Sequence, residues 1–92
     1  MRIKLDGKFK RNFQVIFEYI ARDKLSAAKH FKKELFEQID NLVNFPYKYR
    51  KSYYFNDENV RDMTFKGYTV VYEIKPDEQI IEILDIFNRN KL

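Results

Sequence analysis

The spacing of hydrophobic residues changes once along this 92-residue chain, at Phe45-Pro46, and this change limits the fold more than any other feature. Before this point apolar residues recur every three or four positions, which is the period of an amphipathic helix. After it they recur at every second position, which is the period of a strand. Helices followed by strands predict an α+β fold of two layers, and we expect a single domain over residues 1–92.

The first half of the chain predicts one short strand followed by two helices. Residues 1–5 alternate hydrophobic with charged side chains, as a strand does, and Asp6-Gly7 interrupts the pattern. A helix is expected from Lys8, and a second one after an N-cap provided by Asp23 or Ser26. The apolar stripes that indicate these helices are Phe9, Phe13, Ile16, Phe17 and Ile20 in the first, and Ala28, Phe31, Leu35, Ile39 and Leu42 in the second. Because few residues join the two helices, they should fold back as a hairpin.

The second half predicts four strands joined by polar turns. These strands are expected at residues 49–55, 60–65, 68–74 and 79–87. The last of them is apolar on both faces, so it should lie inside the sheet and be covered on both sides. The helix hairpin would cover one face, and either a bound partner or neighbouring tyrosine side chains would cover the other. The predicted fold is therefore an antiparallel helical hairpin packed on a mostly antiparallel sheet of four or five strands, which includes the short N-terminal strand.

Composition and charge narrow the classes of function. The chain has no cysteine and one histidine, His30, which excludes disulfides and cysteine nucleophiles and argues against a histidine-based zinc site or triad. We expect no metal and no cofactor. No apolar stretch is long enough for a membrane span or a signal peptide, so we expect a soluble cytoplasmic protein without a membrane partner.

The net charge of +4 comes entirely from the first half of the chain. Residues 1–45 carry ten basic and six acidic side chains, whereas residues 46–92 carry eight of each. The cations of the predicted helices lie off the apolar stripes, so they form a solvated face that could also steer an acidic partner. His30 is expected at the margin of the second stripe, as a surface or boundary residue.

Cations placed among aromatic residues in the second half are the candidate functional residues. The catalytic candidates are Arg61, Lys66, Arg89 and Lys51, and the binding candidates are Lys48, Arg50, Tyr68 and Lys91. If the sheet curves, its strand ends would bring these cations and rings into a basic concavity that suits single-stranded RNA or phosphate. Two other interpretations stay open. The cations at positions 48–51 would serve equally on a solvated edge strand, and Tyr68 would serve in the core.

Arg61 is the strongest single candidate, because it alternates in phase with Met63 and Phe65 and so falls in a core-facing register. A guanidinium placed there needs an acidic neighbour or an anionic ligand. The sequence leaves both possibilities open. The acidic neighbour within the chain would be Asp85, Glu73 or another strand carboxylate.

Taken in order, these pieces resemble the RelE/ParE superfamily of bacterial toxins from type II toxin–antitoxin modules. The resemblance rests on Ile16-Phe17-Glu18-Tyr19-Ile20-Ala21, then Ala27-Ala28 and Phe31, then Ile39, Leu42 and Phe45-Pro46, then Arg61, then residues 66–74, and finally residues 81–87. It covers nearly the whole chain and implies the same two-layer fold. It also implies a growth inhibitor of the plasmid-stabilisation type, which a cognate antitoxin neutralises in a hetero-oligomer.

The resemblance implies two different targets. Members of the ParE type poison DNA gyrase, whereas members of the RelE type cleave mRNA on the ribosome with cationic side chains and a general acid or base. Several ribonuclease members place a functional Tyr or His near the end of the C-terminal strand, where this chain has Phe87-Asn88-Arg89-Asn90-Lys91. We therefore favour the ParE type, with a ribosome-dependent endoribonuclease as the alternative and a non-toxic binding module as the second alternative.

Overall fold

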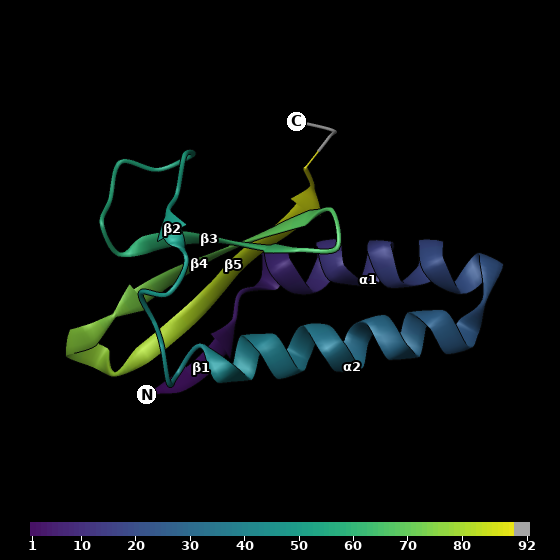
Figure 1. Ribbon diagram of the computed structural model, residues 1–92, viewed down its shortest axis with the longest axis horizontal. Helices are drawn as coiled ribbons and strands as arrows, with labels where there is room; N and C mark the ends of the chain where they lie inside the picture. Colours follow the sequence, from purple (N-terminus) through teal and green to yellow (C-terminus); the bar gives the residue numbers. More distant parts are fainter. Residues whose placement is uncertain (90–92) are drawn as a thin grey trace.

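The computed structural model describes residues 1–89 and contains two helices packed on a five-stranded sheet. Helix α1 (Gly7–Asp23) and helix α2 (Leu25–Asn41) run side by side as an antiparallel hairpin (Figure 1). The buried residues of both helices share a core with those of the sheet. The predicted two-layer α+β fold is confirmed. Within the described residues, no helix is both long and apolar enough to cross a membrane.

The sheet is mostly antiparallel, with strand order β1-β5-β4-β3-β2. Its strands are β1 (Arg2–Leu5), β2 (Arg50–Lys51), β3 (Val60–Phe65), β4 (Tyr68–Lys75) and β5 (Ile80–Asn88), with a short 3-10 turn at Pro76–Glu78. Strand β1 runs parallel to β5, and the other neighbours are antiparallel. The prediction that the last strand lies inside the sheet is confirmed, although the middle position belongs to β4.

The helix hairpin turns on a single residue, Lys24. Helix α1 begins at Gly7, one residue before the expected start, and the Asp6 carboxylate caps it by accepting a hydrogen bond from the Lys8 backbone N–H at 2.9 Å. Lys24 is the C-cap of α1 and also the residue before α2, and its backbone is extended. The prediction that Asp23 or Ser26 caps α2 was wrong, since Asp23 still belongs to α1 and Ser26 already lies within α2.

The strand predicted at residues 49–55 is much shorter, because β2 contains only Arg50 and Lys51. The Ser52 N–H still donates to the Val60 carbonyl at 2.8 Å, but the Tyr53 N–H turns to the buried carboxylate of Asp62 at 3.2 Å. The Asp62 side chain thus takes the place of the backbone carbonyl that would accept from Tyr53 in a longer strand, and the chain leaves the sheet edge at this point.

The face of the sheet opposite the helices is covered in part by this same connection. Val70 and Tyr72 of β4 belong to the helix-side core, so strand alternation places Thr69 and Val71 on the opposite face, where both are buried. The Tyr54 ring meets the Phe87 ring of β5 edge-on, with centroids 5.3 Å apart, and so reaches across β3 and β4. Tyrosine cover, one of the two predicted options, is therefore present.

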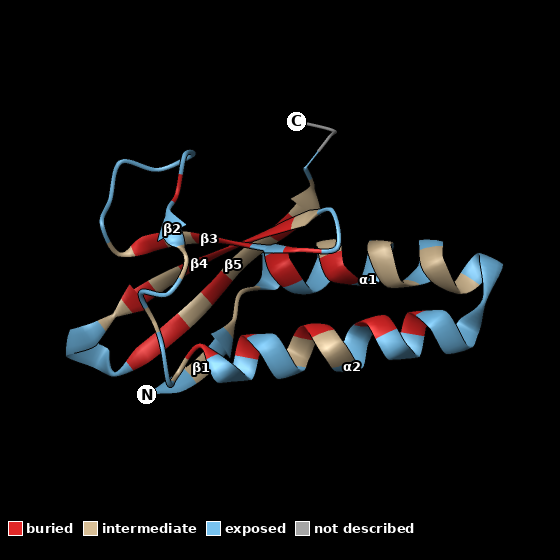
Figure 2. Ribbon diagram, in the orientation of Figure 1, coloured by how far each residue is buried: buried red, intermediate tan, exposed pale blue. Residues whose placement is uncertain are grey.

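Aromatic rings from both helices fill the helix-side core. Phe9 stacks on Phe13 with centroids 6.0 Å apart, and the edge of Phe36 from α2 meets both rings. Phe31 meets Phe65 of β3 at 5.3 Å. Buried residues occur along both helices and along β3, β4 and β5 (Figure 2), and most of them belong to this one core. These contacts fix the helices relative to the sheet and position the surfaces described next.

Candidate functional site

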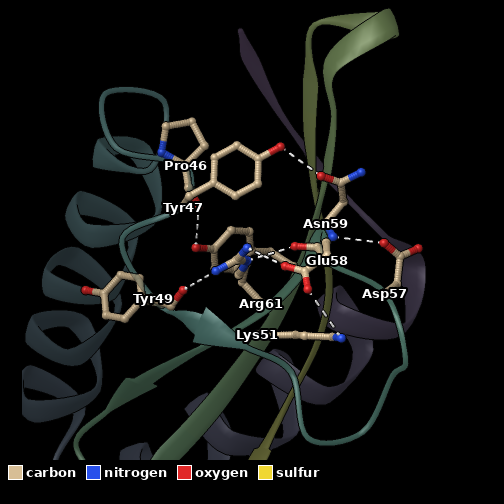
Figure 3. Close-up of polar contacts among 9 residues, drawn as sticks. Pro46, Tyr47, Tyr49, Lys51, Asp57, Glu58, Asn59 and Arg61 are labelled. Atoms are coloured by element: carbon tan, nitrogen blue, oxygen red, sulfur yellow. Dashed lines mark hydrogen bonds and ion pairs between the residues drawn. The ribbon is translucent and has the colours of Figure 1, made fainter.

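Arg61 lies at the centre of a cluster that joins two stretches of irregular chain (Figure 3). Its Nη1 donates to the Tyr49 carbonyl at 3.1 Å, and its Nε donates to the Glu58 carbonyl at 2.9 Å. Its Nη2 lies 3.5 Å from the Glu58 carboxylate, and the guanidinium lies 4.9 Å from the centroid of the Tyr47 ring. Only 15% of the side chain is exposed. Arg61 therefore acts as a clamp between the chain before β2 and the turn before β3.

Two tyrosines support the same clamp. The Tyr72 hydroxyl donates to the Pro46 carbonyl at 2.7 Å, and burial raises the pKa of this phenol well above its ordinary value. The Tyr47 hydroxyl donates to Asn59 Oδ1 at 2.8 Å. Each contact ties the segment after α2 to the sheet or to the turn before β3, so the cluster stabilises the local chain path.

The core-facing register predicted for Arg61 is confirmed, because it pairs with Tyr72 across β3 and β4. Its acidic neighbour differs from the two residues named from sequence. The carboxylate beside Arg61 is Glu58, three residues earlier and outside the strands, whereas Asp85 accepts from Asn12 at 2.6 Å. The sequence pattern could not locate Glu58, since its position depends on how the turn before β3 folds.

Replacing Arg61 by Ala should lower the free energy of unfolding by about 2–3 kcal/mol, because two backbone carbonyls lose charge-assisted donors. Arg61→Lys should recover little of this loss, since a single ammonium cannot reach both carbonyls in the same geometry. Urea denaturation of the purified variants measures the effect. A stability loss below about 0.5 kcal/mol would contradict the clamp.

The other candidate cations fall into two groups at opposite ends of β3. Lys51 lies 3.5 Å from Glu58, and Arg50 lies 3.3 Å from Asp62, both beside Arg61. Lys48 lies over the ring of its neighbour Tyr49. At the other end of β3, Lys66 follows the strand and Tyr68 begins β4, and the Arg89 N–H donates to the Gly67 carbonyl between them. Lys91 lies outside the described residues. Arg61 and Lys66 are five positions apart along β3 and the turn after it, a distance of about 17 Å. The described cations therefore do not share one concavity.

Lys66 connects the β3–β4 turn to α2 through Glu34. The Lys66 ammonium lies 2.7 Å from one Glu34 oxygen, and His30 Nε2 contacts the other oxygen from one helical turn earlier. The hydrogen bond from Lys66 holds the pKa of the Glu34 carboxyl below its ordinary value of 4.5. His30 is exposed on α2, consistent with a surface residue.

This link predicts a pH-dependent contribution to stability. A carboxyl whose pKa is depressed in the folded state stabilises the fold above its ordinary pKa, and the contribution is lost as pH falls through the folded value. We expect Lys66→Gln to melt below the wild type at pH 6 and the two proteins to converge as pH falls below the ordinary carboxyl pKa of 4.5 and through the lower value of the folded state. Thermal melts between pH 3 and pH 7 measure this gap, and a gap that stays constant would contradict the assignment.

An apolar groove lies between α1 and the C-terminal half of β5, and the sequence analysis did not identify it. The groove has a volume of about 420 Å³ and is lined by Asn12, Val15, Ile16, Tyr19, Tyr68, Ile86, Phe87 and Asn88. Val15 and Tyr19 are 66% and 67% exposed. Val15 and Tyr19 are four residues apart and lie off the buried stripe of the helix, so the sequence could have indicated a second apolar surface on α1.

The β5 edge beside this groove is only half covered. Strand β1 pairs with residues 80–83 of β5, and within residues 1–89 no other strand pairs along the outer edge of residues 84–87, where the Ile86 N–H donates to the Asp85 carboxylate at 2.8 Å. A strand edge without a pairing strand, beside an apolar groove, is a place where a partner segment can bind. In the described part of the chain, no three His, Asp or Glu side chains gather where they could hold a metal ion.

Two solved structures with a similar arrangement of helices and strands come from toxin–antitoxin systems. The chromosomal ParDE system from P. aeruginosa matches with a TM-score of 0.74 and 19% identity, over 96% of this chain and 95% of the other. The intact RelBE toxin–antitoxin complex from E. coli matches with a TM-score of 0.55 and 15% identity, over 94% and 93% of the two chains. At these identities the matches show a shared fold, and this fold defines the RelE/ParE class of α+β proteins.

The sequence itself identifies the family within that class. Residues 3–92 match the family described as ParE toxin of type II toxin-antitoxin system, parDE. The chain therefore belongs to the ParE toxin family, which confirms the resemblance drawn from its sequence pattern. A search among individual curated proteins gives no significant match.

Proposed function

We propose that this protein is a cytoplasmic toxin that inhibits growth by poisoning DNA gyrase, and that a cognate antitoxin neutralises it. The observation that carries the proposal is the match to the ParE toxin family over residues 3–92. ParE-type members of the superfamily act on gyrase, and the role in plasmid stabilisation implied by the resemblance follows from the same assignment. The protein would act by binding its target, without a catalytic step of its own.

The environment of the candidate cations supports this non-enzymatic mechanism. Arg61 donates to two backbone carbonyls, and Arg50, Lys51 and Lys66 each lie beside a carboxylate of the same chain. Cations that stabilise a phosphoryl transition state have to converge on one phosphate and keep donors available to it. The division of these cations between the two ends of β3 does not favour that arrangement.

The groove between α1 and β5 is the proposed docking site of the antitoxin. Its apolar lining suits the hydrophobic side of an extended or helical segment, and β1 covers the neighbouring edge of β5 only along residues 80–83. Lys8 and Arg11 occupy exposed positions of α1 near its start, and the Lys8 ammonium lies 3.4 Å from the Asp85 carboxylate. An acidic amphipathic segment would therefore match both the shape and the charge of this side of the molecule.

Gyrase assays with the purified protein test the proposed function. We expect the protein to inhibit supercoiling and to stabilise the covalent cleavage complex, and we expect equimolar antitoxin to reverse both effects. A protein that arrests growth without affecting gyrase would contradict the proposal. Primer extension on translated mRNA then separates the remaining options, because new 5′ ends within codons would indicate the ribosome-dependent endoribonuclease. Normal growth after induction without antitoxin would indicate the non-toxic binding module.

A further inference from the structure

A second surface, separate from the groove, is formed by the chain between α2 and the turn before β3. We call residues 45–55 the aromatic segment. Five large aromatic side chains of this segment are exposed: Phe45, Tyr47, Tyr53, Tyr54 and Phe55. Tyr53 is the most exposed of them at 80%. Exposed aromatic residues in this number over so short a stretch mark an interaction surface.

The exposed ring of Tyr53 is held in place by a guanidinium. The Arg50 carbon Cζ lies 3.6 Å from the centroid of the Tyr53 ring, which is close stacking contact. One face of the ring is therefore occupied, while the exposure of the side chain leaves the other face open to solvent. This pair presents a flat, polarised aromatic surface.

Buried polar contacts fix this pair relative to the sheet. Asp62, which is 1% exposed, accepts from the Tyr53 N–H at 3.2 Å and pairs with Arg50 at 3.3 Å. The Ser52 hydroxyl accepts from the Tyr54 N–H at 3.1 Å, and the Tyr54 ring packs on Phe87. Burying a carboxylate costs free energy unless it is paired, and the partners of the Asp62 carboxylate are Arg50 and the Tyr53 N–H, the two residues of the exposed stack. The ring is therefore already ordered before any ligand arrives, which lowers the entropy cost of binding.

A shallow hollow of about 490 Å³ lies next to this stack and is lined by residues 51–56. Lys51 is one of its lining residues, and among residues 1–89 its ion pair is with the exposed carboxylate of Glu58, 3.5 Å away. An exposed pair of this kind contributes little, so a phosphate can replace the carboxylate. Lys48 supplies a further exposed cation on the same segment.

We propose that this hollow binds single-stranded nucleic acid, with one base stacked on the open face of Tyr53 and its phosphate against Lys51. Stacking rings alternating with cations are the features that bind single strands without sequence preference. A duplex does not fit this description, because its base faces are covered by neighbouring pairs. An aliphatic or acidic protein surface would gain less from the prebuilt Arg50–Tyr53 stack than a nucleobase does.

Fluorescence anisotropy with labelled twelve-residue oligothymidylate and oligouridylate tests this binding at low salt, with a duplex of the same length for comparison. We expect both single strands to bind and the duplex to bind more weakly. Tyr53→Ala should weaken binding of the single strands tenfold or more, since one stacked base is lost, whereas Tyr53→Phe should retain it. The two probes also show which sugar the hollow prefers.

Charge variants separate this site from general attraction to a basic protein. Lys51→Gln should weaken binding and reduce the magnitude of its salt slope by roughly 0.7. Lys4→Gln removes an equal charge from β1, at the opposite edge of the sheet, and should change binding little. Glu58→Gln should strengthen binding two- to threefold, because it removes the carboxylate that competes with phosphate.

Three results would overturn the proposal. One is the absence of single-strand binding by a folded wild type, and another is equal binding by wild type and Tyr53→Ala. The third is that Lys4→Gln and Lys51→Gln weaken binding equally. If Tyr53→Ala abolished gyrase inhibition while neither oligonucleotide bound, the hollow would be a protein interface and the proposal would be wrong. Circular dichroism confirms folding of each variant, and this binding can fail while the gyrase function stands.

Discussion

Phe9→Ala is expected to lower the free energy of unfolding by about 3–5 kcal/mol, which is a large part of the stability of a chain this size. Phe9 is 1% exposed and lies at the start of α1, where its ring contacts Phe13 and the edge of Phe36 from α2. Removing the ring leaves a cavity at the point where both helices meet, and neighbouring rings cannot fill it without leaving their own contacts. Chemical denaturation followed by circular dichroism measures the loss.

Phe45→Ala is the matched control for this change, because it removes the same ring from a position that is 60% exposed. We expect it to change the free energy of unfolding by less than about 1 kcal/mol. Equal effects at the two positions would contradict the description of the helix-side core. A loss below about 1 kcal/mol at Phe9 would mean that the core rearranges to fill the space.

Val15→Glu is expected to weaken antitoxin binding by roughly 30- to 1,000-fold, equivalent to about 2–4 kcal/mol. The substitution places a carboxylate in the apolar groove, where a bound segment would remove it from water without a partner. Because Val15 is exposed in the free protein, the fold should be retained. Isothermal titration or surface plasmon resonance with the antitoxin measures the affinity, and growth assays should show a toxin that its antitoxin no longer controls.

Gln38→Glu provides the matched control for Val15→Glu. It makes the same change of charge at an exposed position on α2, away from the groove lining. We expect at most a few-fold change in affinity from it. If both variants weakened the complex equally, long-range charge would explain the effect, and the antitoxin would have to dock elsewhere.

The fold could be predicted from the sequence because hydrophobic spacing records which face of each element is buried. The stripe through Phe31, Leu35 and Ile39 defines α2, and the alternation across β3 places Arg61 in the core-facing register. Both features depend only on local periodicity. Contacts between residues far apart in the sequence could not be predicted from local periodicity.

Three differences between prediction and structure arise because they depend on contacts that local periodicity does not record. The long strand expected at residues 49–55 ends early because Asp62, nine positions after Tyr53, provides a competing acceptor. The helix cap differs because the hairpin is closed by Lys24 alone. The groove was not predicted because one wall comes from α1 and the other from β5, and no sequence period connects residues about seventy positions apart.

The parallel pairing of β1 with β5 has a consequence for the order of assembly during synthesis. The first strand pairs with residues 80–83, and the backbone N–H of Asp6, the cap of α1, donates to the Ile83 carbonyl at 2.9 Å. At translation rates of 5–20 residues per second, roughly 4–16 s pass between the synthesis of β1 and the synthesis of residues 80–83. The sheet can therefore close only after residues 80–83 have been made, and a nascent chain that lacks them has no complete platform for its helices. A partial chain would therefore lack the complete fold, and the groove between α1 and β5 would form at the same moment as the sheet.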